Sequence, residues 1–267
     1  TMSTNRTLAG PPGDCCFKSF RHEGTPLGTK TTIADIPTYV SEPPSNDNST
    51  SDKSRRIIIF LSDIFGPFYQ NNMLLQDSLA QNGFTVLGVD YFLGDAVYHH
   101  LDKPGFDRMA WIAEMHKIAQ EVTPKWWAAV KAKYGEARYC ISGYCFGASY
   151  TMDIANSEDV VVATSLAHPA FLNEEHFRKI KKPLMISCAE IDHTFPAKER
   201  RIAEDIVTQQ KAQYYFQIFS GVEHGFSARG DPSVGDSRWA KEQSAQGISL
   251  WFHRFYNELE QQSGNKV

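Results

Sequence analysis

Short apolar runs alternate with amphipathic segments along most of this 267-residue chain, and no other feature limits its possible folds as strongly. The run Arg56–Leu61 is continuously apolar after its first residue, as expected of a strand covered on both faces. Further strands are expected at 84–89, 138–142, 160–166, 184–189 and 213–219, with helices between them. Repeated strand–helix units require a mostly parallel sheet with helices on both faces. The sequence therefore predicts an α/β fold.

The predicted helices carry signals of their own. The helix at 106–134 is expected to break near Thr123-Pro124, because proline removes a backbone donor and clashes with the preceding turn. The last helix has the clearest pattern, one broad apolar stripe at three- and four-residue steps. That stripe comprises Trp239, Ala245, Ile248, Trp251, Phe252, Phe255 and Leu259.

The length suits one large unit, so residues 1–267 are expected to form a single α/β domain. Residues 1–28 are expected to form an extended N-terminal arm. Residues 41–56 have no apolar side chain to offset the entropy of ordering, which predicts a mobile polar surface loop.

A net charge of −4 and a pI of about 6.1 offer no basic surface to nucleic acid or anionic lipid. No apolar run is long enough to span a bilayer. Five cysteines, an odd number, argue against a disulfide framework and favour a reducing, cytoplasmic location. Metal-ligand spacings of the HxxxH or CxxC kind are absent, so neither a metal nor a cofactor is expected. The sequence leaves monomer and homodimer equally open.

The strand at 138–142 runs into Gly143-Tyr144-Cys145-Phe146-Gly147, and a helix follows. This is the nucleophile elbow G-x-S-x-G with cysteine in place of serine. So sharp a turn strains the backbone of its central residue, and flanking glycines let strand and helix approach. The positive end of the following helix favours a thiolate. Cys145 is the candidate nucleophile, and the alternative is a buried structural cysteine in a glycine-rich turn.

Two polar residues complete a catalytic set with Cys145. Asp192 follows the strand at 184–189, and His224 follows the last strand. The chain order nucleophile, acid, histidine is that of the α/β-hydrolase fold, and open α/β sheets place their sites at these strand ends. We therefore predict a Cys145–His224–Asp192 triad, with His193 as an alternative base.

Other candidates lie near the same edge. His168 also follows a strand and is expected either to line the pocket or to be a satisfied structural histidine. The loop after the first buried strand supplies one oxyanion donor in this fold, here Ile64, and the residue after the nucleophile supplies the other, here Phe146. Cys15 and Cys16 lie in the polar arm and are expected to be incidental to the site.

With these residues identified, the chain resembles the dienelactone hydrolase family, and in particular its fungal branch. The resemblance covers nearly the whole chain, from Cys15-Cys16 to the last helix. Its most specific parts are Gly143–Gly147, Asp63–Gly66, Asp90–Asp95 and His224–Phe226. It implies an α/β-hydrolase fold with Cys145 as nucleophile, His224 as base and Asp192 as the acid that orients the base.

The chain departs from bacterial members of that family at three positions. Those members carry a glutamate where Asp63 stands, and it interacts with the resting thiol. An arginine that follows their Asp-x-Tyr element is not matched after Tyr91. Their other substrate-binding arginine falls at Ala228, one residue before Arg229. The resemblance therefore does not imply that dienelactone itself is the substrate.

We expect a hydrolase of a small-molecule lactone or carboxylic ester that works through a Cys145 thioester. One alternative is a non-hydrolytic cyclase, isomerase or acyltransferase of fungal specialised metabolism that uses the same site. Another is a non-catalytic, hydrolase-like binding protein. The expected substrate contacts are Asp63, Phe65, Tyr91, Tyr144, His168, Phe226 and Arg229.

Overall fold

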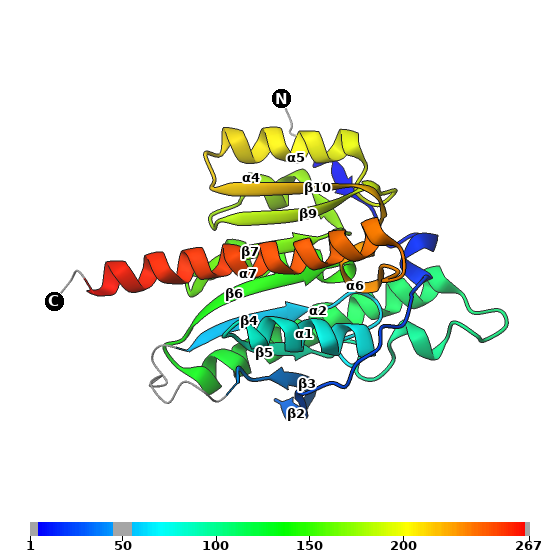
Figure 1. Ribbon diagram of the computed structural model, residues 1–267, viewed down its shortest axis with the longest axis horizontal. Coiled ribbons are helices and arrows are strands. Elements are labelled where there is room, and N and C mark those ends of the chain that lie inside the picture. The colour runs from blue at the N-terminus through cyan, green and yellow to red at the C-terminus, as the bar shows by residue number, and fades with distance from the viewer. Residues whose placement is uncertain (1–4, 45–54, 265–267) are drawn as a thin grey trace.

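The computed structural model describes residues 5–44 and 55–264, and its centre is an eight-stranded sheet (Figure 1). The strand order is β10-β9-β7-β6-β4-β5-β3-β2. The strands are β2 (Thr29–Ile33), β3 (Ile36–Ser41), β4 (Arg56–Leu61), β5 (Thr85–Val89), β6 (Arg138–Tyr144), β7 (Val161–Ala167), β9 (Leu184–Ile191) and β10 (Tyr214–Glu223). Only the β2–β3 and β3–β5 pairs are antiparallel in this sheet. The predicted mostly parallel α/β sheet is confirmed.

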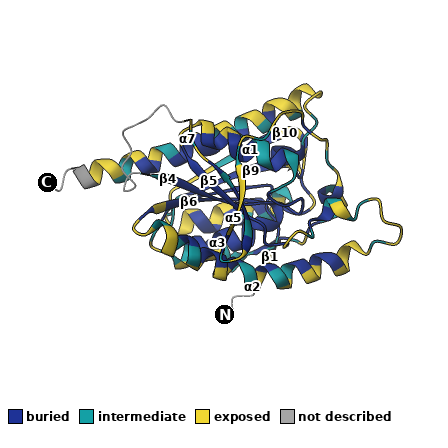
Figure 2. Cartoon of the chain, turned by 90° about the horizontal axis from the view of Figure 1, so that it is seen from below, coloured by how far each residue is buried: buried dark blue, intermediate teal, exposed yellow. Residues whose placement is uncertain are grey.

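Helices cover both faces of the sheet, as Figures 1 and 2 show from two directions. The helices are α1 (Gln70–Gln81), α2 (Arg108–Tyr134), α3 (Ala148–Ser157), α4 (Glu174–Arg178), α5 (Ala197–Gln209), α6 (Phe226–Arg229) and α7 (Gly235–Gly264). The described residues also form the short 3-10 turns η1 (Asp14–Phe17), η3 (Val97–His99) and η4 (Cys145–Gly147). One core lies under α1 and α7, and others lie under α2, α3 and α5.

Strand β4 shows why its sequence is apolar throughout. Ile58 and Phe60 pack in the core under α1 and α7, whereas Ile57 and Ile59 point to the opposite face, under α2. All four side chains are fully buried. Burial of each aliphatic side chain contributes about 1.5–3 kcal/mol, so a strand in this position tolerates no polar face.

Helix α2 is continuous through Pro124, so the predicted break at Thr123-Pro124 is wrong. The residues that follow the proline hold the helix in place. Trp126 is fully buried, and its Nε1 donates to Oγ1 of Thr38 at 2.8 Å. Burial of this aromatic side chain against the sheet offsets the one backbone hydrogen bond that proline removes.

Three further expectations need correction. The N-terminal arm is not extended throughout, because Asp14–Phe17 form the 3-10 turn η1. Its strand β1 (Thr7–Ala9) pairs antiparallel with β8 (Leu172–Asn173) as a second, two-stranded sheet. The predicted loop at 41–56 is shorter at both ends, since Ser41 belongs to β3 and Arg56 to β4. Residues 45–54, which make up most of the segment predicted to be mobile, lie outside the described residues. Trp239 is 58% exposed and does not join the apolar stripe of α7.

Within the described ranges, no helix combines the length and the apolar character needed to cross a membrane.

A buried carboxylate ties the end of the N-terminal arm to the body of the protein. Asp77 on α1 accepts hydrogen bonds from the backbone N–H groups of Leu27 (2.7 Å) and Gly28 (3.2 Å). The hydroxyls of Tyr39 and Ser41 on β3 also donate to it. One side chain thus fixes the arm, the sheet edge and a helix together.

Replacing Asp77 with alanine should lower the free energy of unfolding by ~1–3 kcal/mol, because buried donors lose their acceptor. Ser78→Ala, at an exposed position of the same helix, is the matched control and should change it by no more than about 0.5 kcal/mol. Urea unfolding of the two variants measures the difference. Equal stability would contradict the role given to Asp77.

Candidate active site

The turn after β6 holds Cys145 in a strained backbone conformation with a φ of +48°. A Cβ on Gly147 would lie 2.2 Å from the carbonyl oxygen of Leu61 on the neighbouring strand β4. A Cβ on Gly143 would lie 2.2 Å from Oγ1 of Thr151 on α3. Only glycine allows these close approaches, which explains the spacing of the elbow.

Asp192 and His224 meet just beyond the ends of β9 and β10. His224 Nδ1 lies 2.9 Å and 3.0 Å from the two carboxylate oxygens of Asp192. Asp192 Oδ1 also accepts the backbone N–H groups of Thr194 (2.8 Å) and Phe195 (2.9 Å). Because two amides fix the carboxylate, the carboxylate in turn fixes the imidazole. Among the described residues, His224 Nε2 has no hydrogen-bond partner.

The pKa values of the pair move apart. Burial acts to raise the pKa of Asp192, but the charge of His224 and its hydrogen bond outweigh burial and hold that pKa below its ordinary value. Burial acts to lower the pKa of His224, but Cys16 and Asp192 outweigh burial and raise that pKa well above its ordinary value. The arrangement favours a charged carboxylate and makes the imidazole a stronger proton acceptor.

The predicted nucleophile has an unexpected neighbour. Cys16 Sγ, on η1 of the arm, lies 3.8 Å from Cys145 Sγ. The two sulfurs and a ring nitrogen of His224 all lie within 4.8 Å of one another, and all three residues are buried. All five cysteines are free thiols. The expectation that Cys16 is incidental to the site is therefore wrong.

Asp63 and Arg229 form a fully enclosed ion pair beside this cluster. Asp63 Oδ1 also accepts Nδ2 of Asn72 (2.9 Å) and the backbone N–H of Phe65 (3.0 Å). Arg229 lies over the Phe65 ring, 5.0 Å from its centroid, and its Nε donates to the carbonyl of Lys18 at 3.1 Å. Burial lowers the pKa of Arg229 to about 10. Within the described chain, its Nη2 has no hydrogen-bond partner.

The remaining histidines differ sharply. His168 is fully buried with a φ of +37°, and its ring centroid lies 4.9 Å from that of His224 and 5.8 Å from that of Phe226. Burial lowers the pKa of His168 well below its ordinary value, so its ring is neutral. Neither of its ring nitrogens has a hydrogen-bond partner among the described residues. His193 is exposed, whereas His224 takes the contact with Asp192.

The two tyrosines expected at the pocket lie on different sides of the sheet. Tyr91 packs with Phe146, with ring centroids 5.5 Å apart, in the same core as Cys145. Its hydroxyl donates to the carbonyl of Ser62, in the loop that carries Ile64. Tyr144 instead packs on Phe60, 4.8 Å away, in the core under α1 and α7.

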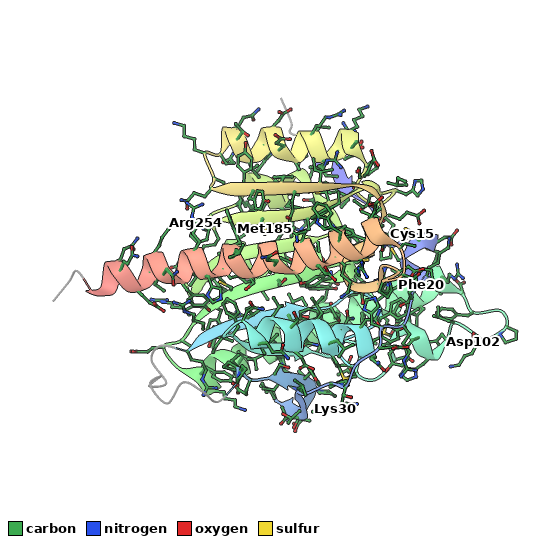
Figure 3. The ribbon with its side chains drawn as sticks, viewed as in Figure 1. Cys15, Phe20, Lys30, Asp102, Met185 and Arg254 are labelled. Carbon is green, nitrogen blue, oxygen red and sulfur yellow. The ribbon has the colours of Figure 1, made fainter. Side chains whose placement is uncertain are left out.

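The candidate active site is enclosed by the protein. Cys145, Phe146 and Ile64 are fully buried. The hollow beside His224 has a volume of about 220 Å³ and is lined by His224, Arg229 and the arm residues Cys15, Lys18 and Phe20, among others. Figure 3 shows Cys15 and Phe20 close together at one end of the sheet. A larger hollow of about 590 Å³ lies on β10 and α7, away from these groups.

Sheet, elbow and strand-end acid and histidine together define the protein as an α/β-hydrolase. Residues 37–256 match the model of the "Dienelactone hydrolase family". The chain belongs to the dienelactone hydrolase family and is a hydrolase.

Individual relatives agree with this assignment. "Dienlactone hydrolase 1" of Gibberella moniliformis is 35% identical over 252 residues, which cover 91% of this chain and 94% of that protein. "Hydrolase tropI" of Talaromyces stipitatus is 33% identical over 261 residues, covering 93% and 98%. The solved structure of a putative dienelactone hydrolase from Klebsiella pneumoniae superposes with a TM-score of 0.69 at 16% identity, covering 86% of this chain and 99% of that one.

The Asp192→Asn variant should have a lower pKa at His224, because the neutral amide no longer stabilises the imidazolium. Proton NMR titration of the imidazole measures this change. Glu190→Gln removes the same charge at an exposed position on β9 and should leave the pKa of His224 nearly unchanged. An unshifted pKa in Asp192→Asn would contradict the coupling.

The same pair should make stability depend on pH. The raised pKa of His224 adds stability that is complete below its ordinary value of 6.5 and disappears as pH rises through the folded value. The lowered pKa of Asp192 adds stability that is complete above its ordinary value of 3.8 and disappears as pH falls through the folded value. The stability gap between wild type and Asp192→Asn should therefore be widest between these two pH values.

Proposed function

We propose that this hydrolase opens a lactone or cleaves a carboxylic ester through a thioester on Cys145. The observation that carries the proposal is the Asp192–His224 pair beside the elbow thiol, in which Nε2 of His224 has no hydrogen-bond partner among the described residues. A ring nitrogen of His224 lies within 4.8 Å of Cys145 Sγ, and catalytic hydrogen bonds are often longer in a free enzyme than in its substrate complex.

The proposed reaction has two halves. His224 takes the thiol proton, and the Cys145 thiolate attacks the substrate carbonyl while the Ile64 and Phe146 amides hold the oxyanion. His224 then protonates the departing alcohol or enol oxygen, which leaves a thioester. Water activated by His224 releases the acid and restores the thiol. Asp192 fixes the imidazole tautomer and stabilises its cation throughout.

Asp63 suggests which substrates fit. Its carboxylate neutralises Arg229, so binding a second carboxylate there would have to break a buried ion pair. Nη2 of Arg229 has no acceptor within the described part of the chain, so it can donate to a neutral oxygen. We therefore propose an uncharged lactone or ester, packed against Phe65, Tyr91, His168 and Phe226. The contact predicted for Tyr144 stays a prediction, because Tyr144 packs under α1 and α7 although its ring centroid lies 6.1 Å from that of His168.

One observation favours the non-hydrolytic alternative. Cys145 is fully buried, and a thioester formed there would be shielded from bulk water. Transfer of the acyl group to a hydroxyl of the same or a second molecule would then compete with hydrolysis. Product mass distinguishes the two reactions, because hydrolysis adds one water and cyclisation or transfer does not.

Turnover of a panel of enol-lactones and aryl esters tests the proposal, each offered with and without a carboxylate substituent. Cys145→Ala and His224→Ala should each lose at least ~10³-fold in kcat/KM, because each removes one partner of the acylation step. Neutral substrates should be preferred to their carboxylated counterparts. Intact mass spectrometry should detect an acyl group on the wild type with an activated ester.

Cys140→Ala is the matched control, since Cys140 is a buried cysteine on the same strand but in the core under α1 and α7. It should retain activity close to that of the wild type. Hydrolysis that survives in Cys145→Ala would exclude the thioester mechanism.

A further inference from the structure

The proposed mechanism leaves one buried thiol at the site without a role. Cys16 is fully buried and faces the nucleophile, although 129 residues separate it from Cys145. Its short turn is docked at several points. The Cys16 N–H donates to Gly13 at 2.9 Å, and the carbonyl of Lys18 accepts Nε of Arg229. The Phe17 ring lies under the Arg108 guanidinium, 4.8 Å from it. The arm thus holds the second sulfur at the site.

The spacing of the two sulfurs matches a metal site. Zinc binds thiolate sulfur at about 2.3 Å, so two thiolates at the tetrahedral angle lie about 3.8 Å apart. The observed separation of Cys16 Sγ and Cys145 Sγ is 3.8 Å. A ring nitrogen of His224 is the third donor, within 4.8 Å of both sulfurs. A side-chain adjustment of about 1 Å completes three corners of a tetrahedron, and water can occupy the fourth.

The surroundings of His224 are those of a metal-binding histidine. Its Nδ1 side is hydrogen-bonded to Asp192, and Nε2 is buried without a partner among the described residues. A carboxylate behind the imidazole orients the ring and strengthens the donor nitrogen, as in carboxylate–histidine–zinc arrangements. Asp192 is itself fixed by the amides of Thr194 and Phe195.

The donor set selects the kind of metal. Two thiolates and an imidazole suit a soft or borderline cation such as Zn²⁺, not Mg²⁺ or Ca²⁺, which prefer oxygen. Two thiolates also cancel the charge of a divalent ion in this enclosed place. Binding releases to solvent the protons of both thiols, together with the extra proton of His224 when its imidazole is charged, and changes no oxidation state.

We propose that Cys16, Cys145 and His224 together bind one zinc ion, and that this ion holds the enzyme inactive until it is removed. Zinc would occupy both the attacking sulfur and the proton-accepting nitrogen, so acylation cannot begin while it is bound. The inhibition rests on the proposed function of Cys145 and His224. The metal binding does not depend on it.

Cobalt(II) and zinc(II) salts added to the reduced, full-length chain test the proposal. Cobalt should bind once per chain and give the near-ultraviolet thiolate-to-cobalt charge-transfer band of a tetrahedral site, which zinc should abolish by displacement. Cys16→Ser should weaken zinc binding by more than the ~10–100-fold typical of losing an outer-shell partner of a metal ligand. A phosphine reductant keeps the thiols reduced without itself competing for metal as a dithiol would.

Activity provides the second measurement. Zinc should inhibit wild-type hydrolysis reversibly, with recovery on adding a chelator. Cys16→Ser should still hydrolyse substrate, and its inhibition should require more than ~10–100-fold higher zinc. Cys15→Ser, which changes the neighbouring half-buried cysteine outside the trio, should keep the zinc affinity of the wild type.

Each contrary outcome is informative. Unchanged zinc affinity in Cys16→Ser, equal loss in Cys15→Ser, or no charge-transfer band in the wild type would overturn the assigned site. A chain that binds cobalt with that band but hydrolyses nothing would support the metal site while removing the proposed function.

Discussion

The close approach of Gly147 to the carbonyl oxygen of Leu61 determines the geometry of the whole catalytic edge. It brings the helix after β6 against the end of β4, and the sharp turn between them carries Cys145 above the sheet. The loop that leaves β4 carries Ile64 and Asp63 to the same place. Because β9 and β10 run parallel to β6, their ends deliver Asp192 and His224 to this edge as well. This contact therefore helps to fix Cys145, the proposed nucleophile, relative to Asp192 and His224.

The sequence was informative wherever a short stretch decides the structure. The apolar run of β4 needs burial on both faces, and the Gly143–Gly147 spacing has one mechanical explanation, so both follow from local pattern. The strand β1 is three residues long, and nothing within it indicates its partner β8. At Pro124 the local pattern predicted a helix break that does not occur. Packing of Trp126 against the sheet stabilises the continuous helix more than the proline destabilises it.

The N-terminal arm is the part of the site that local reasoning missed. Its polar composition suggests a segment that does not pack on the domain, yet its backbone both accepts a hydrogen bond from Arg229 and donates one to it. The Lys18 carbonyl accepts from Arg229, and the Phe20 N–H donates to the Arg229 carbonyl at 3.4 Å. Cys16 then reaches Cys145 across 129 residues of sequence, a separation that no metal-ligand spacing describes. Only the pair of adjacent cysteines, at the start of the region that resembles the family, hinted at a role.

The presence of cysteine instead of serine at the elbow changes what this group of side chains can bind. A serine hydroxyl next to a second hydroxyl would gain only a hydrogen bond, whereas two thiols beside an imidazole form a ligand set for soft metals. The features that activate Cys145 also favour that set. In the proposals above, the imidazole fixed by Asp192 would assist deprotonation of the thiol, and the enclosure that would shield a thioester from water would also shield a bound ion from exchange. In the proposed mechanism and the proposed metal site, catalysis and zinc binding would use the same contacts. Cys16 would distinguish them, because its sulfur would bind the metal but would form no bond in the acyl transfer.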